Sequence, residues 1–439
     1  MQHEGSYGDL FINRFNDYYE KNRFTDEARA SQILEWMGKF DNSIQCSDSW
    51  FNVSAKGLAE YKHCDGDLLL NWKNRGYKTL LDILRVLHSM SCNYRNSRFH
   101  CLTSKKIAKQ TSELIVVKMQ TTMFAKRRQN VEIERSCIHV ETDNINIHSR
   151  ESPKLETSKT CRLFHRSKHK HPDHLEVFPI FENIRCSTEV KKIDYVNPNE
   201  ITITTHTGED IKANNVIFTA SLGVLKHDYT SLFNPPLPRS KELAINGLNI
   251  GTVNKIFLEF SHQWWPTEAA DFEFLWPEEE KKKFLEETPA EDHWLLDVFG
   301  FFTVDYQPRI LCGWITGEGA RDMETLPACE VKEKIYGLLK KFLDKKYIIP
   351  SPDKILTSKW HSDSSFRGSY SFRSLTSEDR NVWASDLAHP IVTGVNKPII
   401  LFAGEATHSH YYSTVHGAVM TGFREANRLI EYYARGSAS

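Results

Sequence analysis

The hydrophobic pattern near the C-terminus predicts a buried strand, a turn and a helix. Residues 399–403 form a short continuous apolar run, which is typical of a strand buried on both faces, and the turn residues Gly404 and Glu405 end it. Ser413 or Thr414 then provides an N-cap, because apolar residues recur at helical spacing after them. The free N–H groups at the start of such a helix favour an anion or a developing anion.

Hydrophobic periodicity also divides the rest of the chain into helical and β-rich parts. Apolar residues in 6–40 recur at spacings of three and four, which predicts amphipathic helices. Alternation broken by turn residues predicts a hairpin and further strands in the second half. These strands are residues 184–193, 200–205, 215–219 and 249–260. After them, residues 267–350 alternate aromatic strands with charged helices.

Lys255 stands within one of these strands. It shares a face with Phe257 and Glu259, whereas Ile256 and Leu258 share the other face. A lysine in such a run is either an edge-strand residue whose stem covers apolar surface, or a functional cation. The residue pattern alone favours the edge-strand reading.

Residues 87–174 differ in composition from both flanks. They are rich in Lys, Arg, Ser, Thr and His, with basic groups at 126–128 and 165–171. A nucleic-acid patch lacks the aromatic platform it would need, and no paired ligand spacing supports a metal site. We interpret the segment as a disordered insertion or an artefact of the gene prediction.

Bulk composition excludes several classes of protein. A chain of 439 residues with 40% hydrophobic and 12% aromatic content predicts two or three globular domains. A net charge of −1 argues against nucleic acid or an anionic membrane as the main partner. Nine cysteines at irregular spacings fit a reduced compartment. With no signal-peptide core and no apolar run near the roughly 20 residues of a membrane span, we expect a soluble, cytoplasmic monomer.

The predicted strand, turn and helix at the C-terminus resemble a known cofactor-binding motif. Leu-Phe-Ala-Gly-Glu-Ala-Thr-His at 401–408 and Tyr-Tyr-Ser-Thr-Val-His-Gly-Ala at 411–418 resemble the flavin motif of FAD-dependent amine oxidases, nearest the polyamine and spermine oxidase branch. The resemblance implies FAD as cofactor, with the positive end of the helix facing the flavin pyrimidine ring. The cofactor-binding residues it implies here are Glu405, Ala406, Thr414 and Val415.

Further matches to this family lie upstream, at residues 220–226 and 366–371. They imply that Lys255 holds a water near flavin N5 and that the backbone of Val190 contacts the adenine side of FAD. They also imply that Trp360 and Tyr370 form an aromatic wall beside the flavin, where a substrate amine gains cation–π attraction. The alternative, which we favour less, is that both are ordinary core aromatics that need no further account.

Acidic residues in the first part of the chain allow two interpretations. They either attract a polycationic substrate or serve as loop acids and N-caps, and we favour the second interpretation. These residues are Asp41, Asp48, Asp65 and Asp67.

The resemblance implies an α/β (mixed α+β) fold with two domains of the amine-oxidase type. One is a Rossmann-like FAD-binding domain, incomplete at its N-terminus because no Gly-x-Gly-x-x-Gly fingerprint occurs in the chain. Without that unit we expect an exposed apolar sheet edge. The predicted parts are a helical part of the substrate-binding domain at 1–70, the FAD-binding domain at 71–86, 175–245 and 356–435, the insertion at 87–174, and the remaining substrate-binding domain at 246–355.

The function implied is oxidation of polyamines such as spermine or spermidine, a step of polyamine catabolism. Hydride would pass to flavin N5, and O₂ would reoxidise the flavin to give hydrogen peroxide, an aldehyde and a shorter amine. The partners expected are therefore a small polyamine and O₂. Two alternatives stay open: a non-catalytic homologue that does not hold FAD stably, favoured by the missing fingerprint, and a flavoprotein like the histone lysine demethylases.

Overall fold

A computed structural model describes residues 4–22, 26–63, 79–80, 114–117, 184–268 and 271–436. The chain divides into two compact units, one of Met1–Leu80, Leu102–Gln120 and Cys186–Ser439, the other of Leu81–Cys101 and Thr121–Arg185. Every element below belongs to the first unit. The predicted domain bounds remain predictions.

A largely parallel sheet carries the predicted C-terminal strand. Its order is β1 (Leu114–Val117), β5 (Asn215–Phe218), β15 (Pro398–Phe402) and β14 (Ile391–Val392). The first three strands are parallel, and β14 is antiparallel to β15. All residues of β5 and β15 are buried, as predicted for strands covered on both faces.

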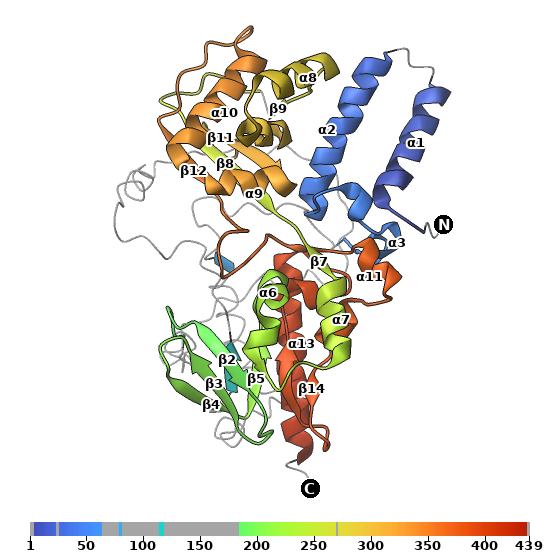
Figure 1. Ribbon diagram of the computed structural model, residues 1–439, viewed down its shortest axis with the longest axis vertical. Helices are drawn as coiled ribbons and strands as arrows, with labels where there is room; N and C mark the ends of the chain where they lie inside the picture. Colours follow the sequence, from blue (N-terminus) through green and yellow to red (C-terminus); the bar gives the residue numbers. More distant parts are fainter. Residues whose placement is uncertain are drawn as a thin grey trace, which may run out of the picture. The chain divides into compact units, whose positions relative to one another are not determined.

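Helices cover both faces of this sheet. Ile217 and Leu401 pack with Leu429 of α13 (Val415–Gly436), which runs alongside the sheet (Figure 1). The alternate strand residues join a larger apolar cluster with helices on the other face, because successive side chains of a strand point to opposite sides. Those helices are α6 (Leu222–Leu232), α7 (Arg239–Gly247) and α12 (Ala384–Ala388).

Strand β1 corrects one expectation. It lies within the segment interpreted as an insertion, and it pairs with β5 from Leu114 opposite Asn215 to Val117 opposite Phe218. The strand β5 is therefore paired on both sides, and residues 114–117 belong to the sheet rather than to a disordered segment. The apolar run Leu-Ile-Val-Val has the high β-propensity that such a pairing needs. The rest of 87–174 lies outside the described residues.

The predicted hairpin is present with a shorter first strand. Strands β2 (Val190–Asp194) and β3 (Ile201–Thr205) are antiparallel, within a sheet of order β4-β3-β2-β6. Its other members are β4 (Asp210–Ala213) and β6 (Phe233–Asn234). Residues 184–189, predicted as strand, precede β2 and are not part of it, and Ser187 has a left-handed backbone with φ 54°.

An antiparallel five-stranded sheet forms the second core, in the order β12-β8-β11-β10-β9. The strands are β8 (Val253–Glu259), β9 (Asp271–Glu273), β10 (Val298–Val304), β11 (Gln307–Thr316) and β12 (Lys354–Thr357). The helical elements of this region are α8 (Glu278–Glu287), η5 (Ala290–Asp297), α9 (Gly317–Thr325) and α10 (Ala328–Leu343). Aromatic and branched aliphatic side chains fill its core, as the alternation of 267–350 predicted.

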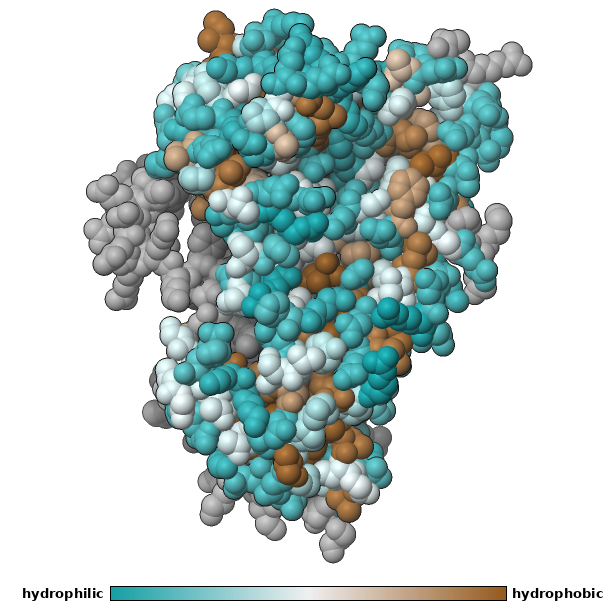
Figure 2. Space-filling view, viewed as in Figure 1, coloured by the Kyte–Doolittle hydropathy of each residue, from teal (hydrophilic) through white to brown (hydrophobic). Residues whose placement is uncertain are grey.

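Two amphipathic helices begin the chain, as predicted. They are α1 (Tyr7–Lys21) and α2 (Glu27–Gln45), followed by the short η1 (Trp50–Asn52) and α3 (Ala55–Leu58). The indole N–H of Trp36 donates to Phe299 O at 2.8 Å, which joins α2 to β10. Some apolar side chains of α1 and α2 stay exposed, among them Ile33, Phe40 and Ile44, and Figure 2 shows apolar residues over these helices.

Short elements complete the described fold. They are β7 (Asn249–Ile250), β13 (Ser371–Phe372), α11 (Leu375–Asp379) and η6 (Glu405–Thr407). Strand β7 pairs with β13, so the chain entering the five-stranded sheet lies beside the segment that leads to α11. Within the described ranges, no helix is both long and apolar enough to cross a membrane.

Candidate active site

Glu405 sits where strand β15 ends and holds two distant segments together. Its Oε1 accepts a hydrogen bond from Ser371 N at 3.1 Å, and its Oε2 accepts from Ser371 Oγ at 2.7 Å and Ser413 N at 2.6 Å. Ser413 Oγ in turn donates to Ser371 O. One carboxylate therefore joins β13 to the residues that open α13. In an α/β sheet this position, beyond the carboxyl ends of parallel strands, is where ligands bind.

Thr414, not Ser413, is the N-cap of α13. Thr414 Oγ1 accepts a hydrogen bond from Gly417 N at 3.1 Å and donates to Tyr411 O at 2.7 Å. Ser413 adopts a left-handed backbone with φ 62°, which turns the chain into the helix. Gly417 is needed for this turn, since a Cβ there would collide with Tyr411 O. The first N–H groups of a helix, here those of Val415 and His416, have no intrahelical acceptors.

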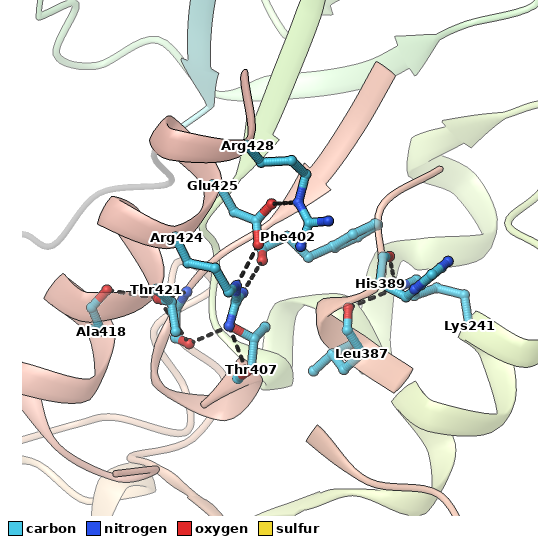
Figure 3. Close-up of polar contacts among 11 residues, drawn as sticks. Lys241, Leu387, His389, Phe402, Thr407, Ala418, Thr421, Arg424, Glu425 and Arg428 are labelled. Atoms are coloured by element: carbon cyan, nitrogen blue, oxygen red, sulfur yellow. Dashed lines mark hydrogen bonds and ion pairs between the residues drawn. The ribbon is translucent and has the colours of Figure 1, made fainter. Parts of the chain in front are cut away.

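A buried polar network fastens the Glu405 turn to α13 (Figure 3). Arg424 donates to Phe402 O at 2.8 Å and to Thr407 O at 2.9 Å, on either side of the turn. Thr421 Oγ1 accepts from Gly404 N at 2.8 Å. The fully buried Glu425 accepts from Arg424 Nε at 2.5 Å and Arg428 Nε at 2.8 Å. Sequence reasoning missed these residues; Thr421 and Arg424, three positions apart on one helix face, were the available signal.

Lys241 supports the same strand from the opposite side. It is 3% exposed and its Nζ lies 4.2 Å from the ring centroid of Phe402. It donates to Asp386 O at 2.9 Å, to Leu387 O at 2.6 Å and to His389 O, at the end of α12. Burial lowers the pKa of Lys241 to about 7. Three carbonyl acceptors match the three N–H donors of the ammonium form, so this geometry opposes the effect of burial on the pKa.

Tyr370 joins the Glu405 site to the N-terminal helices. It directly precedes Ser371, and its hydroxyl donates to Ser43 O of α2. Burial, with Cys46 nearby, raises the pKa of the Tyr370 phenol far above its ordinary value. Tyr370 is therefore a neutral hydrogen-bond donor, held rigidly beside the residues that bind Glu405.

Trp360 and Lys255 are linked through Asn254. Trp360 N lies 3.4 Å from Asn254 Oδ1, so its backbone neighbours the strand residue next to Lys255. The Trp360 ring makes an edge contact with Phe366, with 4.9 Å between centroids. Strand β8, which carries Lys255, lies between β12 and β11, and this excludes the edge-strand reading of Lys255.

Val190 and Ala406 would contribute through the backbone. Val190 opens β2 in the β4-β3-β2-β6 sheet, whereas Ala406 follows Glu405 in η6. Ala406 is 6% exposed and belongs to the apolar cluster below the parallel sheet, so its side chain is used in packing. The structure thus groups Glu405, Ala406, Thr414 and Val415 around one turn and helix start.

The described acids of the N-terminal part already have partners. Arg321 donates two hydrogen bonds of 2.9 Å to Asp48, from Nη1 to Oδ1 and from Nη2 to Oδ2. Asp41 is hydrogen-bonded to Tyr7, and burial raises the pKa of Asp41 to about 6. Asp65 and Asp67 lie outside the described residues. For the two acids described, the favoured reading as structural residues agrees with these contacts.

The Glu405 turn offers space and hydrogen-bond donors to a bound group. Gly404 has φ +131°, and a Cβ placed there would meet nothing nearer than Thr219 O at 4.0 Å, so a bound group can approach the backbone. The start of the 22-residue helix α13 adds free N–H donors and positive potential. These are the donors that a reduced flavin ring would use. The described residues supply no Gly-x-Gly-x-x-Gly loop for a pyrophosphate.

A largely parallel sheet with a donor-rich turn at its carboxyl edge is an arrangement at which α/β proteins bind nucleotide-like ligands. Residues 181–430 match the family model described as "Flavin containing amine oxidoreductase". The chain belongs to this family. The predicted family and amine-oxidase fold class are confirmed, and FAD is the cofactor, as predicted.

The chain is similar to several known proteins. It is 37% identical over 233 residues to the peroxisomal N(1)-acetyl-spermine/spermidine oxidase of Homo sapiens, covering 52% of this chain and 44% of that protein. It is 31% identical over 285 residues to probable polyamine oxidase 5 of Arabidopsis thaliana, covering 57% and 51%. Lysine-specific histone demethylase 1B of Mus musculus is 31% identical over 251 residues, covering 57% and 28%. The chain spans about half or less of these relatives.

Proposed function

We propose that this protein is an FAD-dependent oxidase of polyamines of the spermine and spermidine type. The amine would be oxidised at a carbon next to nitrogen. With water and O₂ consumed, the products are an aldehyde, a shorter amine and hydrogen peroxide, which balances the two electrons removed. Similarity to the human acetylpolyamine oxidase and the plant polyamine oxidase supports this substrate class.

The observation that carries the proposal is the position of the Glu405 carboxylate. Its hydrogen bonds to Ser371 and Ser413 hold the backbone next to Tyr370 and the start of α13 around one turn. A flavin at that turn would meet helix N–H donors and an aromatic residue together. Bound there, FAD would accept hydride from the amine and return the electrons to O₂.

The chain's own residues would then bind FAD, orient the substrate amine and exclude bulk water. Glu405, Ala406, Thr414 and Val415 would hold the flavin end of FAD, and the Val190 backbone its adenine end. Trp360 and Tyr370 would form an apolar wall that favours the neutral amine over its ammonium form, because a desolvated charge is costly. Lys255 would hold a water close to the reacting atoms. No acid–base pair is needed for this chemistry.

An absorbance spectrum tests the proposal directly. The purified chain is incubated with FAD, freed of unbound cofactor and scanned across the flavin bands. We expect a bound flavin that bleaches when spermine or N-acetylspermine is added without oxygen, and recovers with hydrogen peroxide release when air is admitted. A methylated lysine peptide, added in parallel, tests the demethylase alternative suggested by the similarity to demethylase 1B.

A non-catalytic homologue is the main second candidate. The observation favouring it is the absence of a Gly-x-Gly-x-x-Gly loop from the sequence, since that loop cradles the pyrophosphate. A protein that remains colourless after incubation with saturating FAD, yet binds spermine in a calorimeter, would support this candidate and sink the oxidase proposal.

We also propose a cytoplasmic monomer. The described cysteines Cys46, Cys186, Cys312 and Cys329 are all free thiols, which is compatible with a reducing compartment. Light scattering of the purified chain measures the mass, and imaging of the tagged full chain in cells tests the location.

A further inference from the structure

Glu324 is a buried carboxylate to which the flavin motif assigns no role. It lies on α9, is 5% exposed, and belongs to the second core rather than to the Glu405 turn. Its Oε1 accepts from Asn254 Nδ2 at 2.6 Å and from His361 N at 2.9 Å, and its Oε2 accepts from Ser362 N at 2.6 Å. A buried carboxylate is costly unless such donors satisfy it, so each of these bonds constrains the chain.

The donors come from both sides of the proposed catalytic residues. His361 and Ser362 follow Trp360 directly, while Asn254 precedes Lys255 on β8. Glu324 therefore holds one end of the loop that carries Trp360 against one end of the strand that carries Lys255.

Asn254 and Ser358 extend the connection to the Lys255 backbone. Asn254 is fully buried, and its Oδ1 accepts from Ser358 Oγ at 2.9 Å and from Trp360 N at 3.4 Å. Ser358 Oγ accepts from Lys255 N at 2.8 Å, and Ser358 N donates to Lys255 O at 3.0 Å. The loop is thus fastened before and after Trp360, by polar contacts that end on one carboxylate.

Lys359 closes the same loop from outside. Its Nζ donates to the backbone carbonyl of Glu324 at 2.6 Å. The carboxylate of the same residue accepts from the backbone N–H groups of His361 and Ser362. Residues 358–362 therefore make five hydrogen bonds to Glu324 and Asn254. An ordinary surface loop after a strand would not require a buried acid for this purpose.

We propose that Glu324 is a positioning residue that, through Asn254, sets the distance between Trp360 and Lys255. This inference rests on the proposed oxidase function, because it assigns a purpose to the geometry of those two residues. Glu324 itself touches neither substrate nor cofactor in this proposal. Misplacement of a positioned group by about 1 Å can lower a rate by roughly a hundredfold, so a supporting residue can control turnover.

Replacing Glu324 by glutamine provides the sharpest test, because the shape is kept. The amide NH₂ must face at least one of the three donors, so one N–H loses its acceptor whichever way the group turns. Glu318→Gln on the same helix is the matched control, because Glu318 is exposed. Both variants are compared with the unmodified chain at a temperature where thermal unfolding shows all three to be folded.

Two measurements are combined. Hydrogen exchange followed by mass spectrometry reports on the amides of 358–362, and stopped-flow spectroscopy gives the rate of flavin reduction by spermine without oxygen. For Glu324→Gln we expect exchange at His361 and Ser362 to accelerate tenfold or more, and reduction to slow about tenfold to a hundredfold, with unchanged FAD affinity and KM. Glu318→Gln should change neither. Local loosening with an unchanged reduction rate would show a purely structural role and overturn the inference.

Ser358→Ala attacks the same connection from its other end. Where Glu324→Gln does not fold, Ser358→Ala is measured alone: flavin reduction should slow about tenfold or more, and an unchanged rate would contradict the inference. It removes the hydroxyl between Lys255 N and Asn254 Oδ1. If both residues act through one connection, the double variant should reduce flavin no more slowly than the slower single variant. Losses that multiply would contradict the inference.

The failure of the oxidase proposal is distinguishable from the failure of this one. An unmodified chain that is colourless or inert toward amines refutes the oxidase proposal, and with it the purpose assigned to Glu324. If spermine reduces the flavin of Glu324→Gln at the same rate as that of the unmodified chain, only the positioning role is refuted.

Discussion

The Nζ atom of Lys255 lies 4.3 Å from the ring centroid of Trp314, its cross-strand partner on β11. The two residues occupy adjacent central strands, and the lysine side chain lies over the indole instead of extending into water. A cation over an indole face gains roughly 0.5–2 kcal/mol, depending on how dry the site is. The indole therefore restrains the amino group at one place, as a residue that holds a single water would require.

Replacing Lys255 by methionine tests that assignment. Methionine keeps the stem that packs on Trp314 but loses the charge and the hydrogen-bond donors, so we expect a loss of stability of no more than about 0.5–2 kcal/mol and a fall in turnover of about tenfold to a hundredfold. Rates of flavin reduction and reoxidation are measured separately. Lys354→Met, on the exposed neighbouring strand β12, is the control and should retain full activity. Equal rates for both variants would rule out a role for Lys255.

Glu405→Gln should weaken FAD binding. The amide cannot accept from all the donors that now meet the carboxylate, so Ser371 N or Ser413 N loses its acceptor. Leaving one such donor unsatisfied costs about 1–3 kcal/mol, which corresponds to a rise of roughly tenfold to a hundredfold in the dissociation constant if the turn opens on losing that bond. Quenching of flavin fluorescence on titration measures the constant. Glu431→Gln, exposed on the same helix, should leave it unchanged.

Arg424→Met should destabilise the fold. It removes a partner from the fully buried Glu425 and the donor to Phe402 O and Thr407 O. Breaking a buried charge pair typically costs about 3–5 kcal/mol, and Arg428 still pairs with Glu425, so we expect the lower end of that range. Urea unfolding of the cofactor-free chain measures this loss in the free energy of unfolding. Arg435→Met on the exposed end of α13 serves as control. A loss below about 1 kcal/mol would show that the network is dispensable.

Asp41 should make the protein less stable as the pH rises, which is the opposite of the usual effect of a carboxyl group. Burial raises the pKa of Asp41 from its ordinary value of 3.8 to about 6, and the hydrogen bond from Tyr7 opposes this only in part. Between those values the folded state holds more protons than the unfolded state, so this residue's contribution to stability is present at low pH and is lost as the pH rises through about 6.

The Asp41→Asn variant isolates that contribution. Asparagine stays neutral, so the difference in stability between variant and parent should change in the variant's favour from about pH 4 to about pH 7. Denaturant unfolding at several pH values gives both curves, and Asp26→Asn, at the exposed N-cap of α2, corrects for general charge effects. Parallel curves for Asp41→Asn and the parent would mean that Asp41 titrates normally.

Local patterns predicted several elements correctly. The apolar run before Gly404 and Glu405 became the fully buried strand β15, and the helical spacing that follows became α13. Both features depend on the spacing of apolar residues close together in the chain, which can be read directly from a sequence. The choice between Ser413 and Thr414 as N-cap needed the backbone angles, because either hydroxyl can accept the bond in principle.

The sequence by itself therefore determined the family, the C-terminal strand and helix, and the turn that carries Glu405. The tertiary structure alone decided that Lys255 lies on an interior strand, that β1 covers the edge of β5, and that Glu324 reaches the loop of Trp360. The physical reason is that these contacts join residues far apart in the chain. Neither periodicity nor local propensity records which buried carboxylate will meet which distant amide, because only the packed fold brings the two together.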